Sequence, residues 1–401
     1  MITIKTKELT TTLNLIHKTF ASDFSSKTGI DRIHIATLPA KDVLGTGILS
    51  ITAYSKDKHM SATIPCNIET DLTAYVAGSS FCNLIASLTD YDEIKLSLQD
   101  TSLKIIAKAS KYVLRTANLE DFPKMPEYVK NNSVTLTAAE LRKVLNNTAF
   151  CTSNDEARPL FTGLCMEFNA ADNSLIVTGT DTHRMGIDKI SNLQTLSLID
   201  DNNKIIVPAK ALSDAVSFLG KDDTAEILLY WNKNKITFVI NNNNLIFQTA
   251  LIDGQFPNCQ RVVPLDENIA FSVDLPREKL EKSITRILVM AKSSKNKFNT
   301  LKCSLKMPNE VLVITTVNLD LGEGAEALQG KVSGTAIENF EIGINAQYLL
   351  DICKKTTTDN IKFDFTSNQL PIRTNFNNSA IHVLTPIRVN DMKNTITEKA
   401  A

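Results

Sequence analysis

The sequence has few of the residues and motifs on which most enzyme chemistry depends. Its 401 residues include only 14 glycines, and neither the glycine-rich phosphate-binding motifs nor the G-x-S-x-G nucleophile motif is present. The five histidines are scattered, and no H-E-x-x-H zinc motif occurs. The sequence therefore gives no support to a nucleotide-binding enzyme, a hydrolase with a nucleophile elbow or a zinc protease.

Cysteine and long apolar runs are also scarce. The seven cysteines are an odd number, lie far apart and include no C-x-x-C pair, which argues against a disulfide framework or a zinc site. We expect reduced, buried thiols in a cytoplasmic protein. No apolar run approaches the ~20 residues of a membrane span. The N-terminus lacks a charged segment followed by an apolar one, so no secretory signal is expected.

The chain has no excess of charge of either sign. Its 43 Lys and Arg residues oppose 44 Asp and Glu residues, which gives a net charge of −1. A protein that binds nucleic acid over its whole surface should be basic, so this balance argues against a histone-like binder but not against a local basic face. The contents of 43% hydrophobic and 22% charged residues are those of a globular protein, and the length predicts more than one domain.

A repeated pattern runs through the whole chain. Six segments each join a short alternating strand to apolar residues at helical spacing: 1–20, 75–88, 133–150, 205–219, 270–290 and 341–353. Alternating strands with Asn- or Gly-containing turns follow the helices. The pattern recurs about every 67 residues, which is 401 divided by six. Generic strand and helix patterning is the alternative, but six matches in order favour six β-α-β-β-β repeats.

Paired along the chain, the six repeats predict three similar domains of an α+β fold. We place domain 1 at 1–131, domain 2 at 132–264 and domain 3 at 265–401, with a C-terminal extension at 390–401. Polar stretches mark the boundaries, and each domain has a common domain size. Repeated domains joined head to tail either extend as a solenoid or close into a ring.

Two polar segments stand out among the strands. The first, 180–184, contains Asp181 and His183, which could form an acid–base or metal pair, but no second segment supplies the remaining groups. The second, 251–264, carries an Asp-Gly turn and two prolines and indicates an ordered exit from a domain. A binding or structural role is favoured for the first segment, and a hydrolase using Asp181 and His183 remains an alternative.

These segments resemble motifs of the bacterial sliding clamp family, the beta subunit of DNA polymerase III. VTGTDTHRMG at 177–186 is similar to the family's A-T-D-G-H-R-L, and LIDGQFPNCQRVVP at 251–264 is similar to its L-[IV]-[DE]-G-x-[FY]-P string. DFPKMP at 121–126, FNTLKCSL at 298–305 and IHVLTPIRV at 381–389 resemble three further family segments. The matches follow the family order over essentially the whole chain.

The resemblance implies both a fold and a function. The fold is three domains of the DNA-clamp type, with two chains joined head to tail as a homodimeric ring around double-stranded DNA. The function is that of a DNA polymerase processivity factor, not an enzyme, without cofactor or metal. Its partners would be DNA polymerase, the clamp loader and repair proteins. Enclosure would explain the near-zero net charge, because a ring needs only weak, sequence-independent phosphate contacts.

The resemblance also implies a groove for short partner peptides between the second and third domains. An apolar pocket with a few polar groups suits an extended peptide. The matching positions are Phe161, Thr180, Thr182, His183, Arg184, Met185, Pro257, Arg261, Val262, Asn345, Tyr348, Val383, Thr385, Pro386, Ile387 and Arg388.

Two further surfaces follow from a ring. Candidate DNA contacts are basic residues on expected helices, together with one from a divergent loop of the first domain: Lys5, Lys7, Arg32, Arg142, Lys143, Lys210, Lys279 and Lys282. A solvated helix face of mixed charge is the alternative. Candidate contacts for ring closure are Ile85, Leu88, Tyr112 and Leu114 of the first domain and Val289, Met290 and Phe298 of the third. Ordinary core packing is the alternative for these residues.

Three departures from the family pattern affect the expected groove. Thr182 replaces a usual glycine, which restricts the backbone there. Thr385 stands where a bulky apolar residue is common, and the extension 390–401 follows the residues of the groove. These departures motivate a second alternative, a non-replicative scaffold of the clamp fold with an altered groove.

Overall fold

The computed structural model describes residues 1–24, 32–38, 46–55, 57–117, 132–199, 203–240, 244–291, 299–318, 321–376 and 380–389. Its secondary structure repeats one plan, a strand, a helix and three strands. The first two repeats comprise β1 (Ile2–Lys5), α1 (Thr6–Phe24), β2 (Arg32–Leu38), β3 (Thr46–Tyr54) and β4 (Lys58–Ile68), then β5 (Thr73–Ala77), α2 (Gly78–Ala86), β6 (Glu93–Gln99), β7 (Ser102–Ala107) and β8 (Ser110–Arg115).

The remaining repeats follow the same order along the chain. The third and fourth comprise β9 (Asn132–Thr137), α3 (Ala138–Thr148), β10 (Gly163–Asn169), β11 (Ser174–Thr180) and β12 (Arg184–Ile190), then β14 (Lys204–Pro208), α4 (Ala209–Phe218), β15 (Glu226–Trp231), β16 (Lys235–Ile240) and β17 (Leu245–Ala250). The fifth and sixth comprise β18 (Phe271–Pro276), α5 (Arg277–Ala291), β19 (Thr300–Lys306), β20 (Val311–Asn318) and β21 (Gly322–Gln329), then β23 (Glu341–Asn345), α6 (Ala346–Lys355), β24 (Asn360–Phe365), β25 (Ile372–Phe376) and β26 (Ala380–Leu384).

This order confirms the six predicted repeats. Short elements lie between them: β13 (Leu196–Ser197), β22 (Lys331–Gly334), and the 3₁₀ turns η2 (Ala149–Cys151), η3 (Pro159–Thr162), η4 (Cys259–Val262) and η5 (Asp266–Asn268). None of the helices in the described part of the chain is long and apolar enough to cross a membrane.

α3 begins at a capping box, and α1 buries one apolar stripe. At the start of α3, the Glu140 carboxylate accepts a hydrogen bond from the backbone N–H of Thr137 at 2.8 Å, and the Thr137 hydroxyl accepts one from the N–H of Glu140 at 3.2 Å. In α1 the buried residues recur at intervals of three and four, which places them on one face: Leu9, Leu13, Ile16 and Phe20.

The contacts divide the chain into two compact units. Compact unit 1 contains 1–141, 193–203 and 210–251, and compact unit 2 contains 142–192, 204–209 and 252–401. In compact unit 1 one antiparallel sheet runs in the order β13-β9-β15-β16-β17-β4-β1-β6-β7-β8. In compact unit 2 a nine-stranded sheet runs in the order β14-β10-β11-β12-β26-β25-β24-β18-β22, beside a four-stranded sheet of β21-β20-β19-β23. The boundaries of the three sequence domains remain a prediction.

Two strand pairs join successive predicted domains within these sheets. β17 pairs with β4, with Phe247 opposite Met60, and β12 pairs with β26, with Met185 opposite Val383. The second pair matters for function, because it places the segment after β11 beside the last strand of the chain. Since both pairs are continuous backbone ladders, they hold the joined strands in a defined register.

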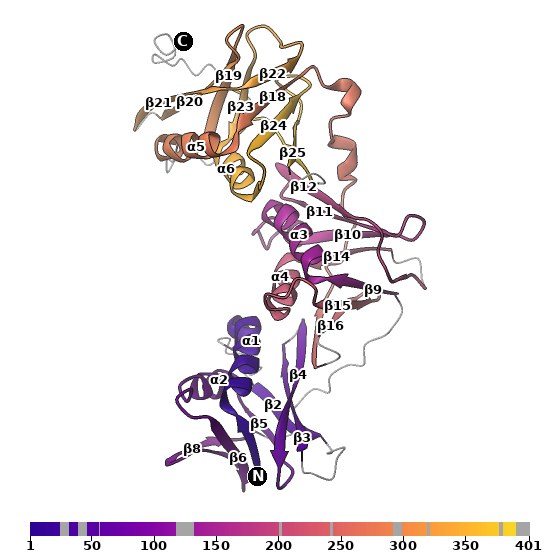
Figure 1. Cartoon of the computed structure of the whole chain (residues 1–401), viewed down its shortest axis with the longest axis vertical. Coiled ribbons are helices and arrows are strands. Elements are labelled where there is room, and N and C mark those ends of the chain that lie inside the picture. Colours follow the sequence, from indigo (N-terminus) through magenta and orange to yellow (C-terminus); the bar gives the residue numbers. More distant parts are fainter. Residues whose placement is uncertain are drawn as a thin grey trace. The chain divides into compact units, whose positions relative to one another are not determined.

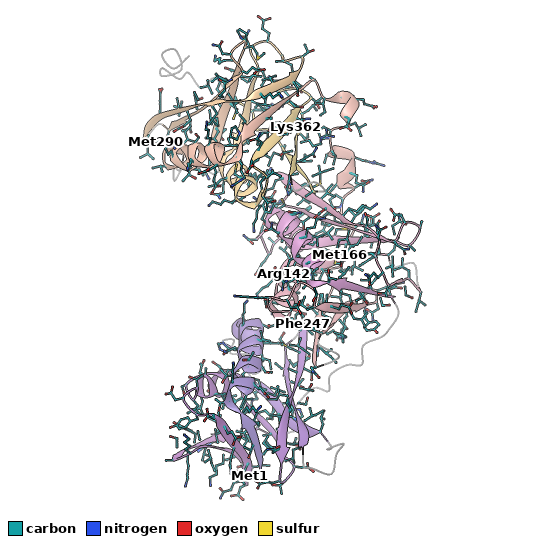
Figure 2. All side chains as sticks on the ribbon, viewed as in Figure 1. Met1, Arg142, Met166, Phe247, Met290 and Lys362 are labelled. Carbon is teal, nitrogen blue, oxygen red and sulfur yellow. The ribbon has the colours of Figure 1, made fainter. Side chains whose placement is uncertain are left out.

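The helices cover the sheets and bury the core between them. Figure 1 shows α5 and α6 side by side, and Figure 2 shows the side chains on the ribbon. Beneath these helices, Phe271, Phe340 and Phe365 form an aromatic cluster with ring centroids 4.9–5.1 Å apart. The seven cysteines are all free thiols, and all except the half-buried Cys259 are buried.

Candidate functional site

The turn between β11 and β12 is organised by the carboxylate of Asp181. One Asp181 oxygen accepts hydrogen bonds from the backbone N–H groups of His183 and Arg184, both at 2.9 Å. The Thr180 hydroxyl accepts from the N–H of Thr182 at 3.1 Å and donates to the carbonyl of Arg184 at 2.7 Å. Asp181 therefore holds His183 through its backbone, and its carboxylate serves the turn, which argues against the predicted acid–base alternative.

Thr182 has a φ of 81°, in the left-handed region that glycine adopts without cost. A β-branched residue there is strained by about 1–2 kcal/mol. The replacement of the family's usual glycine thus keeps the turn geometry at the expense of local strain. The Thr182 and His183 side chains are both exposed at this turn.

Arg184, at the start of β12, is the centre of a nearly buried ionic cluster. Its Nε lies 3.0 Å from Asp181 Oδ2, and its Nη1 lies 2.6 Å from Asp351 Oδ2 of α6. The guanidinium also stacks 4.3 Å from the ring centroid of Tyr348 and 5.6 Å from that of Phe150. These contacts tie the β11–β12 turn to the first turns of α6.

The electrostatics of this cluster follow from burial and from the two carboxylates. Burial alone would lower the pKa of Arg184, but the hydrogen bond with Asp351 and the charge of Asp181 raise it, so the guanidinium stays protonated. Burial raises the pKa of the Tyr348 phenol, and the Asp181 charge adds to this effect. The arrangement presents a neutral hydroxyl on an aromatic ring beside a compensated cation.

Asn345 fixes the start of α6 and thereby the position of Tyr348. Its side-chain oxygen accepts hydrogen bonds from the backbone N–H groups of Gln347 at 2.9 Å and Tyr348 at 3.3 Å. Gln347 in turn donates to Asp351 at 2.8 Å, on the same face of the helix. Asn345 therefore acts within the site as a helix cap.

The C-terminal strand and the residues after it are held on two sides. The N–H of Thr385 donates to the carbonyl of His183 at 2.9 Å, and the N–H of Ile387 donates to the carbonyl of Gly343 at 2.9 Å. A side chain at Gly343 would lie 2.3 Å from the Ile387 carbonyl oxygen, so this close approach requires glycine. Thr385 and Arg388 are exposed, whereas Pro386 and Ile387 are half-buried.

A pocket of about 560 Å³ lies beside this C-terminal segment. Its lining residues come from β23, from the loop before β25 and from the segment itself: Glu341, Ile342, Gly343, Asn368, Gln369, Pro386, Ile387, Arg388 and Val389. Three of these residues were predicted from the resemblance. The pocket therefore adjoins the expected peptide groove at the C-terminal end.

The segment that follows β17 carries further residues of the predicted peptide groove. Phe256 is buried against Cys165 and Ile206, and its ring lies 6.5 Å from that of Phe161 in η3. Pro257, Arg261 and Val262 follow on this segment and are exposed. Phe161 itself is half-buried, with the Arg158 guanidinium 6.0 Å from its ring centroid.

The structure thus brings a large part of the predicted groove together within compact unit 2. His183, Arg184, Tyr348 and Thr385 are linked by the contacts above, and Met185 and Val383 are buried strand partners. The residues that sequence reasoning missed are Asp351, Phe150, Gly343 and the amides at 368 and 369. Of these, Asp351 could have been found from the sequence, because it follows the predicted Tyr348 by three residues and therefore lies on the same face of α6.

Four of the eight basic residues predicted to contact DNA lie near an acidic side chain. Lys5, Lys143, Lys210 and Lys282 each lie near an acidic side chain, with nitrogen–oxygen distances of 3.7, 3.6, 3.1 and 2.6 Å to Glu8, Asp188, Asp214 and Glu278. Lys7 and Lys279 are exposed, Arg142 is half-buried, and the Arg32 guanidinium stacks 5.4 Å from the Tyr75 ring centroid. Their contact with DNA remains a prediction.

The residues predicted for ring closure divide by exposure. Ile85 and Leu88 are buried in the core of compact unit 1 and leave little surface for a partner. Tyr112 is exposed and Leu114 half-buried on β8, while Val289 is exposed and Met290 half-buried at the end of α5. Phe298 and the extension 390–401 lie outside the described residues, as does the segment 121–126.

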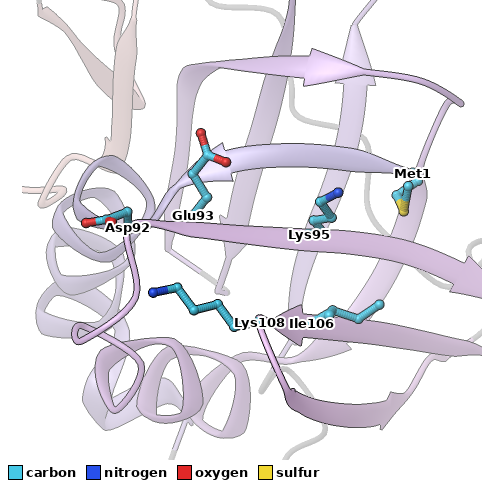
Figure 3. Close-up of a pocket in the computed structure, with 6 residues that line it drawn as sticks. All are labelled: Met1, Asp92, Glu93, Lys95, Ile106 and Lys108. Atoms are coloured by element: carbon cyan, nitrogen blue, oxygen red, sulfur yellow. The ribbon is translucent and has the colours of Figure 1, made fainter.

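A different pocket, of about 750 Å³, lies in compact unit 1 (Figure 3). It is lined by Met1, Asp92, Glu93, Lys95, Ile106 and Lys108. The lining contains none of the predicted groove, DNA or interface residues. Its charges are mixed in sign and exposed, so the pocket indicates no particular ligand.

The chain matches three family models in succession. They are described as the N-terminal, central and C-terminal domains of the DNA polymerase III beta subunit, and they match residues 2–126, 135–258 and 260–388. A beta sliding clamp of Rickettsia bellii is 27% identical over 402 residues, covering 97% of this chain and 99% of the relative. A beta sliding clamp of Synechococcus elongatus is 26% identical over 331 residues, covering 82% and 84%.

Solved structures share the fold. The sliding clamp of Bartonella birtlesii bound to griselimycin superposes with a TM-score of 0.84 at 23% identity, covering 97% of this chain and 99% of that one. The DNA polymerase sliding clamp of Bacillus subtilis gives a TM-score of 0.83 at 20% identity, also covering 97% and 99%. The three-domain clamp fold expected from the sequence is therefore confirmed.

Proposed function

This chain belongs to the family of the DNA polymerase III beta subunit, and from that premise we propose that it is a sliding clamp, the processivity factor of a DNA polymerase. The observation that carries the proposal is the succession of three family domains over 2–388, in register with the six structural repeats. The three predicted domains, 1–131, 132–264 and 265–401, belong to this proposal. The ring would enclose duplex DNA and act by topology, without a catalytic residue or cofactor.

The groove of compact unit 2 would receive short peptides of DNA polymerase, the clamp loader and repair proteins. The exposed Val262 and the half-buried Pro386 and Ile387 offer apolar surface, and the Arg184 cluster and Tyr348 add a few fixed polar groups. This combination suits an extended peptide. The related clamp of Bartonella birtlesii was solved with griselimycin, which supports a ligand-binding role for the fold.

Two open sheet edges support a head-to-tail homodimer. β8 ends the order of its sheet and exposes Tyr112 and Val113, flanked by Lys111 and Arg115. β21 ends the order of the four-stranded sheet and carries Glu323 and Glu326. Exposed strand edges readily pair with another chain. Glu326 is already paired with Arg286 at 2.6 Å, so the charge complementarity between these two edges rests on Glu323.

The alternatives have weaker support. A hydrolase would need Asp181 and His183 to act as an acid–base pair, but the Asp181 carboxylate is engaged by the turn and by Arg184. A non-replicative scaffold rests on Thr182, Thr385 and the extension 390–401, and the structure accommodates Thr182 without loss of the turn. We therefore propose action on DNA in the cytoplasm, and not catalysis.

Retention on circular DNA tests the proposal directly. The protein, loaded onto nicked circular duplex and separated from free protein by gel filtration, should stay with the DNA and be released when a restriction enzyme linearises the circle. A closed ring leaves only by sliding off an end, whereas a protein bound by direct contacts does not respond to the cut. Equal retention on circular and linear DNA would contradict topological binding.

A further inference from the structure

The segment that links β17 to β18 is held at two separated points in compact unit 2. At its start, Phe256 is buried against Cys165 and Ile206. At its end, the carbonyl of Pro264 and the carboxylate of Asp266 both contact Arg373 of β25. Figure 1 shows this segment, which carries η4 and η5, running along the side of the sheet. Between the two points it exposes the predicted groove residues Pro257, Arg261 and Val262.

Arg373 bridges the sheet and this segment through one guanidinium, whose Nη2 contacts both sides. Toward the sheet, its Nε and Nη2 each lie 2.9 Å from Asp364 Oδ2 of β24. Toward the segment, its Nη1 donates to the Pro264 carbonyl at 2.9 Å, and its Nη2 lies 2.6 Å from Asp266 Oδ1. Only the planar, five-donor guanidinium serves both sides at once, and a lysine ammonium does not.

The inner half of this bridge is built into the sheet. Asp364 is only 1% exposed, and its second oxygen accepts a hydrogen bond from the Ser272 hydroxyl at 2.7 Å. Arg373 is 12% exposed, whereas Asp266 is 91% exposed. A buried carboxylate thus fixes the guanidinium, and the guanidinium presents its remaining donors outward to the segment.

The register of the sheet places Arg373 on the same face as two predicted groove residues. Met185 is opposite Val383, Val383 is opposite Arg373, and Arg373 is opposite Asp364 in neighbouring antiparallel strands. Directly opposed residues of antiparallel strands project their side chains from one face. The segment is therefore fastened to the face of the sheet that carries Met185 and Val383.

We propose that Arg373 is a positioning residue for the peptide groove: by clamping 264–266 to β24 and β25, it holds the wall formed by Pro257, Arg261 and Val262 ready for the peptide. This inference rests on the proposed groove. A wall held in place before binding spares the peptide the entropic cost of ordering it. Arg373 itself does not touch the peptide in this proposal.

The decisive variant removes the clamp without leaving a buried charge. Arg373→Gln alone leaves Asp364 buried without its guanidinium, and so we expect a lower unfolding midpoint. Arg373→Gln combined with Asp364→Asn removes both charges together, and we expect most of the midpoint to return. The clamp on 264–266 is still lost in the double variant, so stability and positioning become separable.

Two measurements are made on each full-length variant. Fluorescence anisotropy measures binding of the labelled peptide griselimycin, with which the related clamp of Bartonella birtlesii was solved, and hydrogen–deuterium exchange measures protection of 257–268. For the double variant we expect peptide binding to be roughly tenfold weaker and exchange to be faster, because the wall must now be ordered on binding. Asp266→Asn, which removes the charge from one outer contact, should produce the same changes to a smaller extent, and Glu267→Gln is its matched exposed control.

Each outcome decides the proposal. Weaker peptide binding and faster exchange in the double variant, with the midpoint restored, would support positioning by Arg373. Wild-type affinity or unchanged exchange in the restored double variant would overturn it and leave Arg373 a structural residue only. If the wild type failed to bind this peptide, the proposed groove itself would be wrong and this inference would fall with it, whatever the exchange data showed.

Discussion

Arg184 shows how one side chain both builds and stabilises a binding surface. Its guanidinium joins Asp181 of the β11–β12 turn to Asp351 of α6 and stacks on Tyr348. A nearly buried cation with two carboxylates costs little while all partners are present, but removal of one partner leaves uncompensated charge. The same geometry that would order the proposed groove therefore makes it sensitive to substitution.

We predict that Arg184→Ala lowers the free energy of unfolding by about 3 kcal/mol or more, because Asp181 and Asp351 would remain largely buried without a counter-charge. Chemical denaturation followed by circular dichroism measures the change. Lys189→Ala is the matched control, because its ion pair with Asp172, at 2.8 Å, is exposed and should contribute less than about 1 kcal/mol. Equal, small decreases in the free energy of unfolding of both variants would show that the Arg184 cluster stabilises the protein no more than an exposed ion pair does.

His382 of β26 provides a second test through its titration. The ring is buried, its Nε2 lies 2.5 Å from the carbonyl of Asn147 in α3, and it stacks 5.3 Å from Phe150. Burial lowers the pKa of His382 to about 4 from its ordinary value of 6.5. The unfolded chain therefore takes up a proton between pH 6.5 and 4 that the folded chain does not, and the folded state loses stability as the pH falls through this window.

We predict that, between pH 7 and pH 5, the wild type loses about 2 kcal/mol more unfolding free energy than His382→Gln, which has no titrating ring at this site. Urea denaturation at the two pH values measures this difference. The carboxylates of the protein titrate in both proteins, so their contribution cancels in the comparison. Parallel losses in both proteins would mean that His382 is accessible to protons in the folded state.

The predicted homodimer depends on two strand edges and on the end of one helix. β8 and β21 end their sheets, and the end of α5 leaves Val289 68% exposed on the compact unit that contains β21. An exposed aliphatic side chain next to an open edge is unfavourable in an isolated chain and favourable in an interface. The predicted homodimer would bury both features.

We predict that Val289→Glu converts the dimer to a monomer, because a charge would be buried in the apolar part of the interface. Sedimentation velocity should show the wild type near twice 44.2 kDa and the variant near 44.2 kDa at micromolar concentration. Ile199→Glu is the control, since Ile199 is 71% exposed and lies outside the predicted interface. A wild type that sediments as a monomer would contradict the predicted ring.

Local patterns explain why the repeated architecture could be predicted, and motif resemblance gave much of the groove, but the long-range contacts that build the site could not be predicted. Alternation and helical spacing lie within short segments, so six strand–helix–hairpin repeats were visible in the sequence. The contact of Arg184 with Asp351 spans 167 residues, and that of Arg373 with Pro264 spans 109, so no local pattern reports them. Likewise, Ile85 and Leu88 have the composition of either a core or an interface, and only the packing shows that they are buried.

The charge balance of the entire chain fits binding by enclosure. A net charge of −1 offers little attraction to DNA at a distance, and several of the predicted contacts are already neutralised by acidic neighbours. Lys7 and Lys279 are exposed and have no ion pair among the described residues. A few such contacts would let a ring stay centred on the phosphates and still slide.

We predict that Lys7→Ala and Lys279→Ala each reduce the slope of log K against log salt for linear duplex by about 0.9 per lost phosphate contact. Fluorescence anisotropy across a salt series measures the slope. Lys282→Ala should change the slope less, because its ammonium lies 2.6 Å from Glu278 and is already compensated. Slopes equal to that of the wild type for Lys7→Ala and Lys279→Ala would place these two residues away from the phosphates.

The low reactivity of the native thiols makes this protein suitable for crosslinking through added cysteines. Burial raises the pKa of Cys66 to about 11 and those of Cys165, Cys303 and Cys353 to about 12, and it also raises the pKa values of Cys151 and Cys259. Maleimides and bifunctional linkers react with the thiolate, so these six native cysteines react slowly near neutral pH. One cysteine added to β8 and one to β21 would then react first, and a linker between them would seal the proposed head-to-tail ring around DNA.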